Sequence, residues 1–425
     1  MNDNEYPYGQ NRGETQYPYG QSGSGRPQYP YGQNQGNGQY PYGQNQGNGQ
    51  YPYGQRPADA PYPYRNGQGG SPYPYGNNGG GSPYGGQSYG YKPPRKTLGQ
   101  RARDVFSDPS RRKLMLLGMA AGTGVLLYLL CADFLSLILT SDDAVYRRYL
   151  NDDAFALLVE TMYTIFCMAL PFTLLFGLLR RMESFRAPLR FGKPRGGWQV
   201  VLLLPAGLAV CLIGSLLSSW MISFLSSFGL SFRSYEYALQ QQTEAPETPV
   251  LMLLTVVHTA ILPALLEELV FRGFIMQPLR KYGDWFAIVT SALIFGLVHG
   301  NMTQAPFAIL AGVALGYVNV VTGSMWTNIL LHFLNNLISV LCSFAMTAAG
   351  GSGSLLISAG VMYGMIAIGI AAFVGYVRVN RDFMRLRPGD GRRFPHKAAH
   401  FWLMPTVLLS LILLFIRIAQ DVYLK

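Results

Sequence analysis

The stretch LPALLEELVFRGF, residues 262–274, carries three charged side chains inside a segment that is otherwise almost wholly apolar. The segment runs from about residue 250 to 279 and exceeds the roughly 20 residues that a helix needs to span a bilayer. A charge at bilayer depth costs about 2.5 to 3.5 kcal/mol, so it persists mainly where it faces a cavity or a partner. Glu267, Glu268 and Arg272 therefore indicate an internal site.

The composition supports a membrane setting for this stretch. The chain of 425 residues is 49% hydrophobic and only 13% charged, whereas soluble proteins are about a quarter charged. Apolar segments recur from residue 114 to the end, and we expect an all-α polytopic membrane protein, a bundle of about eight to nine transmembrane helices. The predicted spans are 114–139, 155–179, 198–228, 250–279, 285–300, 304–322, 325–347, 355–377 and 401–418.

The first 91 residues differ in composition from the rest of the chain. The unit YPY begins at Tyr6, Tyr17, Tyr29, Tyr40, Tyr51, Tyr62 and Tyr73, mostly followed by Gly and Gln. Pro and Gly in these repeats exclude a helix, and there are too few aliphatic side chains to offset the ordering entropy. We expect residues 1–91 to be a disordered tail, whose tyrosines could form a multivalent binding surface. The repeats do not identify the partner of the tail.

The distribution of charge predicts the orientation of the bundle. The juxtamembrane segment 92–113 and the connections 180–195 and 376–397 are basic, while 141–153 and 231–249 hold more acids than bases. By the positive-inside rule, nine spans place the N-terminus in the cytoplasm and the C-terminus outside, in a multi-pass protein of the plasma membrane. The net charge of +11 then reflects contact with an anionic lipid bilayer and no nucleic-acid partner.

The two glutamates of the opening stretch have different surroundings in a helix. Glu268 and Arg272 are four residues apart, so they can form an ion pair on one helix face. Glu267 lies about 100° around the helix from Glu268. It has no residue of opposite charge three or four positions away in its own helix, so its partner must be another span or water. The structural alternative is that Glu268 and Arg272 form an ion pair that only stabilises the helix, while Glu267 extends toward the membrane surface near the cytoplasmic end.

Polar residues in two later spans favour a functional reading. FGLVHGN places His299 one turn after Phe295, and HFLNN places His332 and Asn336 one turn apart. A single histidine within a membrane is more often a hydrogen-bonded packing residue. Two of them on separate spans, together with a paired acid, predict a shared cavity near the middle of the membrane.

Such a cavity has the groups that peptide hydrolysis requires. A glutamate can deprotonate water, a histidine can orient it, and further donors can stabilise the developing oxyanion. The alternative is a zinc ion held by Glu and His side chains that activates the water. The sequence contains no HExxH motif, which excludes the commonest zinc-protease helix but not a site assembled from several helices.

The motifs EELVFR, FGLVH and HFLNN resemble the three motifs EExxxR, FxxxH and HxxxN of the CPBP family of intramembrane proteases, also called Abi or CAAX type II proteases. The resemblance covers a catalytic core of about residues 200–345 within the helical domain 114–425. It implies that Glu267 is the catalytic base, Glu268 its companion acid and Arg272 the residue that steadies the pair. It also implies that His299 helps to hold the water, and that His332 and Asn336 form the oxyanion site.

The same resemblance implies an endopeptidase whose substrate is a membrane-embedded or lipidated peptide or protein. No cofactor is favoured, because two His beside two Glu and an Arg offer few well-spaced ligands. If a metal is required, the candidate zinc ligands are Glu267, Glu268, His299 and His332. The rival function is a non-proteolytic transporter or a bacteriocin-immunity-type binding protein, since intramembrane acids and histidines also serve proton relays.

Two further patterns concern packing. The pairs Gly296/Gly300, Gly312/Gly316 and Gly360/Gly364 fit the small-xxx-small spacing that lets helix backbones approach closely. The four cysteines share no CxxC spacing and are expected to be buried thiols, neither disulfides nor metal ligands.

Overall fold

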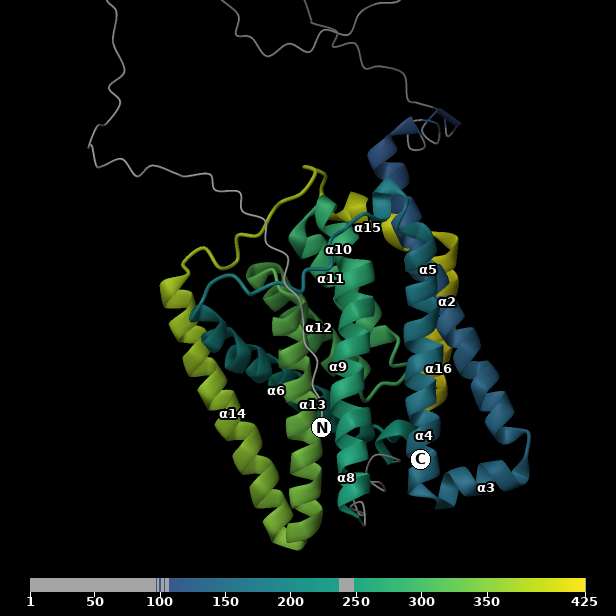
Figure 1. The fold of residues 1–425 in the computed structure, drawn as a ribbon, viewed down its shortest axis with the longest axis vertical. Coiled ribbons are helices and arrows are strands. Elements are labelled where there is room, and N and C mark those ends of the chain that lie inside the picture. The colour runs from purple at the N-terminus through teal and green to yellow at the C-terminus, as the bar shows by residue number, and fades with distance from the viewer. Residues whose placement is uncertain (1–96, 98, 101–102, 104–106, 237–247, 425) are drawn as a thin grey trace, which may run out of the picture. The chain divides into compact units, whose positions relative to one another are not determined.

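The computed structural model describes residues 107–236 and 248–424, together with residues 97, 99, 100 and 103. The predicted tail of residues 1–91 and half of the basic segment 92–113 lie outside the described residues. Where the chain is described, it consists of helices joined by connections, with two strands of three residues each, in agreement with the all-α bundle expected from the sequence (Figure 1).

Seven helices in the described residues are long and apolar enough to cross a membrane, and an eighth span results if one bent helix pair counts as a single crossing. A shorter apolar helix, α11 (Asp284–Leu297), is the ninth apolar segment. The long spans are α2 (Pro109–Thr140), α4 to α5 (Asp153–Leu179), α6 (Gln199–Ser226), α8 to η5 (Pro249–Tyr282), α12 (Ala305–Thr322), α13 (Met325–Ala349) and α14 (Gly351–Val379). The protein is therefore an integral membrane protein.

The span from Pro249 to Tyr282 is continuous but not uniform. It comprises α8 (Pro249–Val256), η3 (Val257–Ile261), α9 (Leu262–Glu267), η4 (Glu268–Met276), α10 (Gln277–Leu279) and η5 (Arg280–Tyr282). Both η3 and η4 are π-helical, and η4 begins at Glu268 itself. The regular α-helix expected here is therefore wrong in detail, because the wider π turns change how the side chains after Glu267 are distributed around the axis. Such π segments are frequent at functional sites.

The end of the chain bends where the sequence predicted one span over 401–418. The helices α15 (Phe394–Trp402) and α16 (Pro405–Asp421) meet at an angle of 81°. Pro405 has no N–H for a continuing helix and disfavours helical geometry in the residue before it, which explains the break. After α16, β2 (Val422–Leu424) pairs with β1 (Leu230–Phe232) in an antiparallel register, and this small sheet was not expected.

The remaining elements connect these spans. The span Asp153–Leu179 contains α4 (Asp153–Met162), the π-helix η1 (Tyr163–Ala169) and α5 (Leu170–Leu179). It is preceded by α3 (Asp143–Asn151) and followed by the 3₁₀ turn η2 (Glu183–Phe185).

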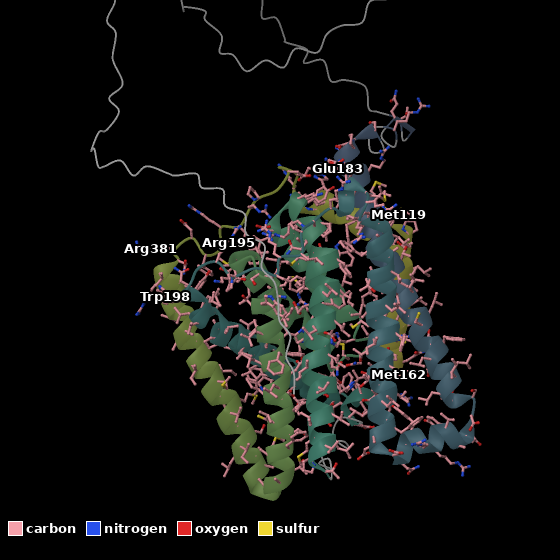
Figure 2. The ribbon with its side chains drawn as sticks, in the orientation of Figure 1. Met119, Met162, Glu183, Arg195, Trp198 and Arg381 are labelled. Atoms are coloured by element: carbon pink, nitrogen blue, oxygen red, sulfur yellow. The ribbon has the colours of Figure 1, made fainter. Side chains whose placement is uncertain are left out.

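The basic segments meet at one end of the bundle, which we call the basic end: residues 107–113, 180–195 and 378–397. Arg392 pairs with Asp108 at 3.0 Å, joining the third segment to the first, and Lys113 pairs with Glu183 at 2.7 Å, joining the first to the second. Figure 2 labels Glu183, Arg195 and Arg381 in this upper part of the bundle. This convergence agrees with one common side of the membrane for all three segments, and the cytoplasm as that side remains a prediction.

Glycines allow α11 and α12 to pack closely. A Cβ atom added at Gly312 would lie 2.9 Å from the Cα of Ala292, so only glycine allows this approach. Added Cβ atoms at Gly296 and Gly316 would also crowd the neighbouring helix. The packing role predicted for Gly360 and Gly364 is wrong, because nothing lies within 4 Å of a Cβ added at either.

The four cysteines are free, in agreement with the sequence prediction. Cys167 and Cys211 are buried, whereas Cys131 and Cys342 are only partly so.

Candidate active site

Glu268 lies at the centre of the site and is fully buried. Its Oε1 accepts a hydrogen bond from Arg272 Nη1 at 2.8 Å and lies 2.9 Å from His332 Nδ1. Its Oε2 accepts a hydrogen bond from Asn328 Nδ2 at 2.5 Å. The ion pair expected from the spacing of Glu268 and Arg272 is therefore present. Three donors occupy this carboxylate and hold it in its present orientation.

Arg272 is held by more than its ion pair. It is also fully buried, its Nη2 donates to the carbonyl oxygen of Gly312 at 3.3 Å, and its guanidinium lies 4.4 Å from the ring centroid of Phe295. Gly312 therefore allows α12 to approach α11 closely, and its carbonyl oxygen also accepts a hydrogen bond from Arg272. A cation over an aromatic ring in a desolvated site adds attraction of about 2 kcal/mol.

Glu267 has much weaker contacts than its neighbour. Its side chain is 13% exposed, and its Oε2 lies 3.8 Å from Nε2 of His332 on α13. This contact with α13 agrees with the sequence prediction that the partner of Glu267 is another span or water. At this distance the two groups interact electrostatically but make no direct hydrogen bond. Within the described residues Glu267 makes no other polar contact, so its carboxylate oxygens remain able to bind water.

His332 lies between the two glutamates. Because the Glu268 carboxylate can only accept, His332 Nδ1 carries the proton that it donates at 2.9 Å. The other ring nitrogen, Nε2, then faces Glu267. This assignment of the ring nitrogens follows from the neighbours of the imidazole.

His299 and His332 contact the same aromatic ring, that of Phe295. The ring centroid of His299 is 5.2 Å from that of Phe295, whereas the ring centroid of His332 is 6.0 Å from Phe295. Both imidazoles therefore pack against the phenylalanine that precedes His299 by one turn. His299 Nδ1 lies 2.8 Å from the carbonyl oxygen of Phe295, which can only accept, so Nδ1 is protonated and Nε2 carries a free lone pair.

The turn that follows His299 is anchored from the end of the chain. Asp421 accepts hydrogen bonds from the backbone N–H of Met302 at 3.1 Å, from the N–H of Ser234 at 2.7 Å and from the hydroxyl of Ser234 at 2.8 Å. Gly300 begins this turn with φ of 67°, a left-handed conformation that glycine adopts without strain. Asp421, which is 119 residues from Met302 in the sequence, therefore anchors the turn that follows His299.

Asn336 lies one turn beyond His332 but has different partners. Its Nδ2 donates to the carbonyl oxygen of Thr259 at 3.1 Å, and its Oδ1 accepts from Asn335 at 3.0 Å. The contacts of Asn336 do not include the other five predicted site residues. One N–H of its amide remains for a substrate oxygen, because an amide group has two.

The side chains are poorly arranged to hold a metal ion. Among the described residues, no three His, Cys, Asp or Glu side chains are placed to share one metal. The carboxylate of Glu268 is occupied by Arg272, Asn328 and His332, and an adjacent arginine opposes a cation. The zinc site considered from the sequence, with Glu267, Glu268, His299 and His332 as ligands, does not fit this geometry.

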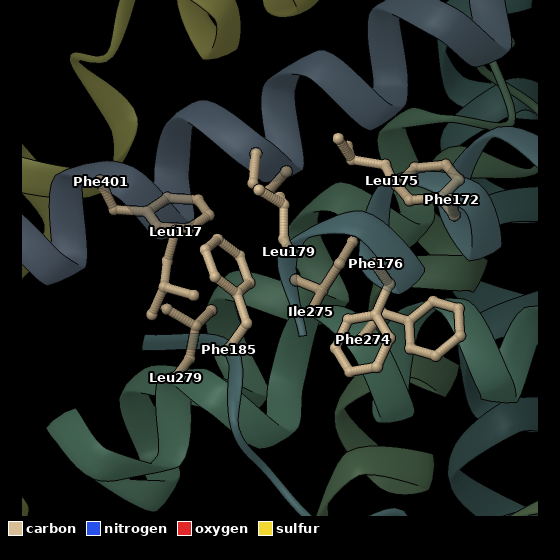
Figure 3. A pocket seen from close by; sticks show the side chains of 12 residues that line it. Leu117, Phe172, Leu175, Phe176, Leu179, Phe185, Phe274, Ile275, Leu279 and Phe401 are labelled. Atoms are coloured by element: carbon tan, nitrogen blue, oxygen red, sulfur yellow. The ribbon is translucent and has the colours of Figure 1, made fainter. Parts of the chain in front are cut away.

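A separate apolar pocket lies between α2, α5, α15 and the Phe274–Leu279 part of the span Pro249–Tyr282 (Figure 3). Leu117, Phe176 and Phe274 are among its lining residues, and its free volume is about 30 Å³. None of the predicted site residues lines it, and it contains no acid or base. It is a packing gap in the core and not the place of the chemistry.

One of the comparisons with known proteins bears on this site. Residues 249–338 match the Rce1-like family, described as type II CAAX prenyl endopeptidase Rce1-like. The predicted resemblance to CAAX proteases is confirmed. The matched residues contain Glu267, Glu268, Arg272, His299, His332 and Asn336. The match supports, in general terms, a CAAX-protease-like intramembrane endopeptidase.

The match covers less than half of the chain. Searches of curated proteins and of solved structures give no significant match.

The sequence analysis missed Asn328. It lies four residues before His332 and therefore on the same face of α13, so its polar amide in an apolar span was a detectable signal. The contact between Asn328 and Glu268 depends on how α13 packs against the span Pro249–Tyr282. This packing cannot be read from the sequence.

Proposed function

We propose that the protein is an intramembrane endopeptidase in which Glu267 activates the water that attacks a peptide bond. The observation that carries this proposal is the contrast between the adjacent glutamates. Glu268 is occupied by Arg272, Asn328 and His332, whereas Glu267 lies 3.8 Å from His332 and retains oxygens that can take a proton from water. A general base needs such a free carboxylate within reach of the water.

The histidines fit two different roles in this mechanism. His299 presents the lone pair of Nε2 and can accept a hydrogen bond from the water, which orients the lone pair of the water oxygen toward the substrate carbonyl. His332 presents Nε2, which donates to the oxyanion when it is protonated, and the free N–H of Asn336 is a second donor. Glu267 returns the proton to the leaving amine as the tetrahedral intermediate collapses. Water supplies the OH of the new acid, so the atoms balance.

The setting of the site suggests the substrate class. Glu267, Glu268 and His332 lie on helices long and apolar enough to cross the membrane, and His299 follows the shorter apolar helix α11. A substrate must therefore reach these groups from the bilayer or from its surface. We propose a membrane-embedded or lipid-anchored peptide or protein as the substrate. The bilayer is therefore part of the recognition.

The test uses the full-length protein reconstituted in lipid nanodiscs, with membrane-anchored and lipidated peptides as substrates and mass spectrometry of the products. We expect cleavage by the wild-type protein and none above background by Glu267→Gln. Equal cleavage by a folded Glu267→Gln protein would remove Glu267 as the base. Binding of every peptide without cleavage would favour the rival binding or transport function.

A metal-free mechanism is also a proposal. We expect activity to survive prolonged chelation and the purified protein to lack stoichiometric zinc. Loss of activity on chelation with recovery on adding zinc would overturn this proposal.

A further inference from the structure

A chain of buried amide side chains leads away from Glu268 into the bundle. Asn328 donates to Glu268 Oε2 at 2.5 Å, and its own Oδ1 accepts from Asn319 Nδ2 at 2.7 Å. Oδ1 of Asn319 accepts from Gln277 Nε2 at 2.8 Å. The three amides are at most 7% exposed and come from α13, α12 and α10, so this chain, which we call the amide chain, connects three separate helices.

The amide chain ends at the basic end of the bundle. Gln277 Oε1 accepts from Arg280 Nη1 at 3.3 Å, and Arg280 Nε donates to Asp284 Oδ1 at 2.8 Å. Asp284 in turn accepts from Arg387 Nη2 at 2.9 Å. A run of hydrogen bonds therefore extends from the connection after α14 to the active site.

The direction of these hydrogen bonds is fixed from both ends. An arginine can only donate, and an ionised carboxylate can only accept. The three amides between Arg280 and Glu268 can satisfy both ends in one orientation only, with each N–H directed toward Glu268. The assignment of amide nitrogen and oxygen, which geometry alone often leaves open, is thus settled by the chemistry of the two ends.

Burying three amide side chains inside a membrane bundle costs free energy unless each amide has hydrogen-bond partners. A buried amide without a partner costs about 1 to 3 kcal/mol, and apolar residues of similar size would fill the same space without that risk. Polar side chains at bilayer depth are therefore functional candidates by default.

We infer that Asn328, Asn319 and Gln277 are positioning residues: they hold the Glu268 carboxylate in one orientation, and through it they hold His332 with Nδ1 on Glu268 and Nε2 toward Glu267. This inference rests on the proposed function. If the Glu268 carboxylate rotated, His332 would lose its Nδ1 acceptor, and the nitrogen presented to the substrate would no longer be fixed. Partners of this kind, one contact removed from the reacting groups, commonly change activity by about 10- to 100-fold.

The decisive comparison is Asn328→Val against Asn328→Thr. The two replacements have nearly the same shape and the same branching at Cβ, but only threonine has a hydroxyl that can donate to Glu268, directly or through one water. We expect Asn328→Val to lower kcat by about 10-fold or more with KM nearly unchanged, and Asn328→Thr to retain several-fold more of kcat. Equal activity of the two variants would reduce Asn328 to a packing residue and overturn the inference.

A second readout does not depend on catalysis. The chain has five histidines, so ¹⁵N-histidine NMR of the reconstituted protein can resolve His332, assigned by its loss in His332→Gln. We expect one Nδ1-protonated signal in the wild-type protein and in Asn328→Thr, and a shifted or divided signal in Asn328→Val. An unchanged signal in Asn328→Val would overturn the inference even if activity fell.

Two controls separate positioning from folding. Thr327→Val changes the preceding buried residue of α13, which is outside the amide chain, and should leave kcat and the His332 signal unchanged. If Asn328→Val does not fold, the same Val and Thr pair at Asn319 tests the next hydrogen bond. If no substrate is ever cleaved, the proposed function fails, whereas the NMR comparison still decides the positioning role.

Discussion

Glu267 and His299 are the two residues whose free polar atoms point to direct participation in chemistry. Glu267 retains oxygens without a hydrogen-bond partner in the described part of the chain, and His299 retains the lone pair of Nε2. We expect Glu267→Gln and His299→Ala each to lower turnover by at least about 100-fold, the usual effect of losing a general base or the group that orients its water. Near-normal turnover in either folded variant would exclude that residue from the mechanism.

Glu268 is expected to matter for folding as well as for turnover. Glu268→Gln removes the negative charge that compensates Arg272 in a fully buried site. Breaking one side of a buried ion pair costs about 3 to 5 kcal/mol, so we expect a clear drop in thermal stability together with loss of activity. Glu183→Gln is the matched control, because the side chain of Glu183 is 76% exposed and its pair with Lys113 is at the surface. We expect Glu183→Gln to leave thermal stability nearly unchanged, as is usual for substitutions at the surface.

At the scale of elements, the contact between α11 and α12 depends on Gly312. A Cβ atom there would lie 2.9 Å from the Cα of Ala292, and the same residue supplies the carbonyl that Arg272 contacts. We expect Gly312→Val to destabilise the protein by about 1 to 3 kcal/mol through overpacking, and to lower activity. Gly364→Val is the control in another helix, since nothing lies within 4 Å of its added Cβ. Equal stability of the two variants in thermal unfolding would contradict this account of the packing.

The start of α2 provides a pH-dependent prediction. Asp108 caps this helix through the N–H groups of Ser110 and Arg111. Burial alone would raise the pKa of Asp108, but the hydrogen bonds from Arg111 and Ser110 and the charge of Arg392 lower it below its ordinary value. A lowered folded pKa means that the stabilisation is fully present above the unfolded pKa of about 3.9 and is lost as the pH falls through the folded pKa.

We therefore expect Asp108→Ala to cost about 1 kcal/mol of stability at pH 7, the usual effect of removing a helix cap. The difference from the wild-type protein should vanish at a pH below the folded pKa, where Asp108 is protonated. Thermal unfolding of both proteins across this pH range measures it. A difference that stays constant down to that pH would show that ionisation of Asp108 contributes nothing.

At the scale of the whole molecule, the repeats of residues 1–91 and the helical bundle are separate in composition. The catalytic motifs all lie within residues 249–338, far from the repeats. Deleting residues 1–91 while keeping Lys92–Lys113 should leave membrane insertion and cleavage of a short peptide intact. Only localisation, clustering or capture of a larger partner should change, as measured by fluorescence microscopy and co-purification. A truncated protein that inserts normally but fails to cleave a short peptide would show that the tail contributes to the active site.

Local composition and spacing were enough to predict several features of the protein. Apolar runs of sufficient length predicted the membrane helices, because a bilayer leaves helices as the natural way to satisfy the backbone. The spacing of Glu268 and Arg272 predicted their ion pair, and the three motifs lie within the residues that match the Rce1-like family. Basic connections predicted which loops share one end of the bundle.

The partners that meet across helices could not be predicted from the sequence and follow from the packing of the bundle. The tertiary structure placed His332 between Glu267 and Glu268, and it brought Asn328 to the carboxylate of Glu268. The π-helical segment η4, which begins at Glu268 and packs against α11 and α13, was not predicted either. Hydrogen bonds between distant residues depend on how helices rotate and approach one another, and that is fixed by side-chain packing over the whole bundle, not by the local sequence.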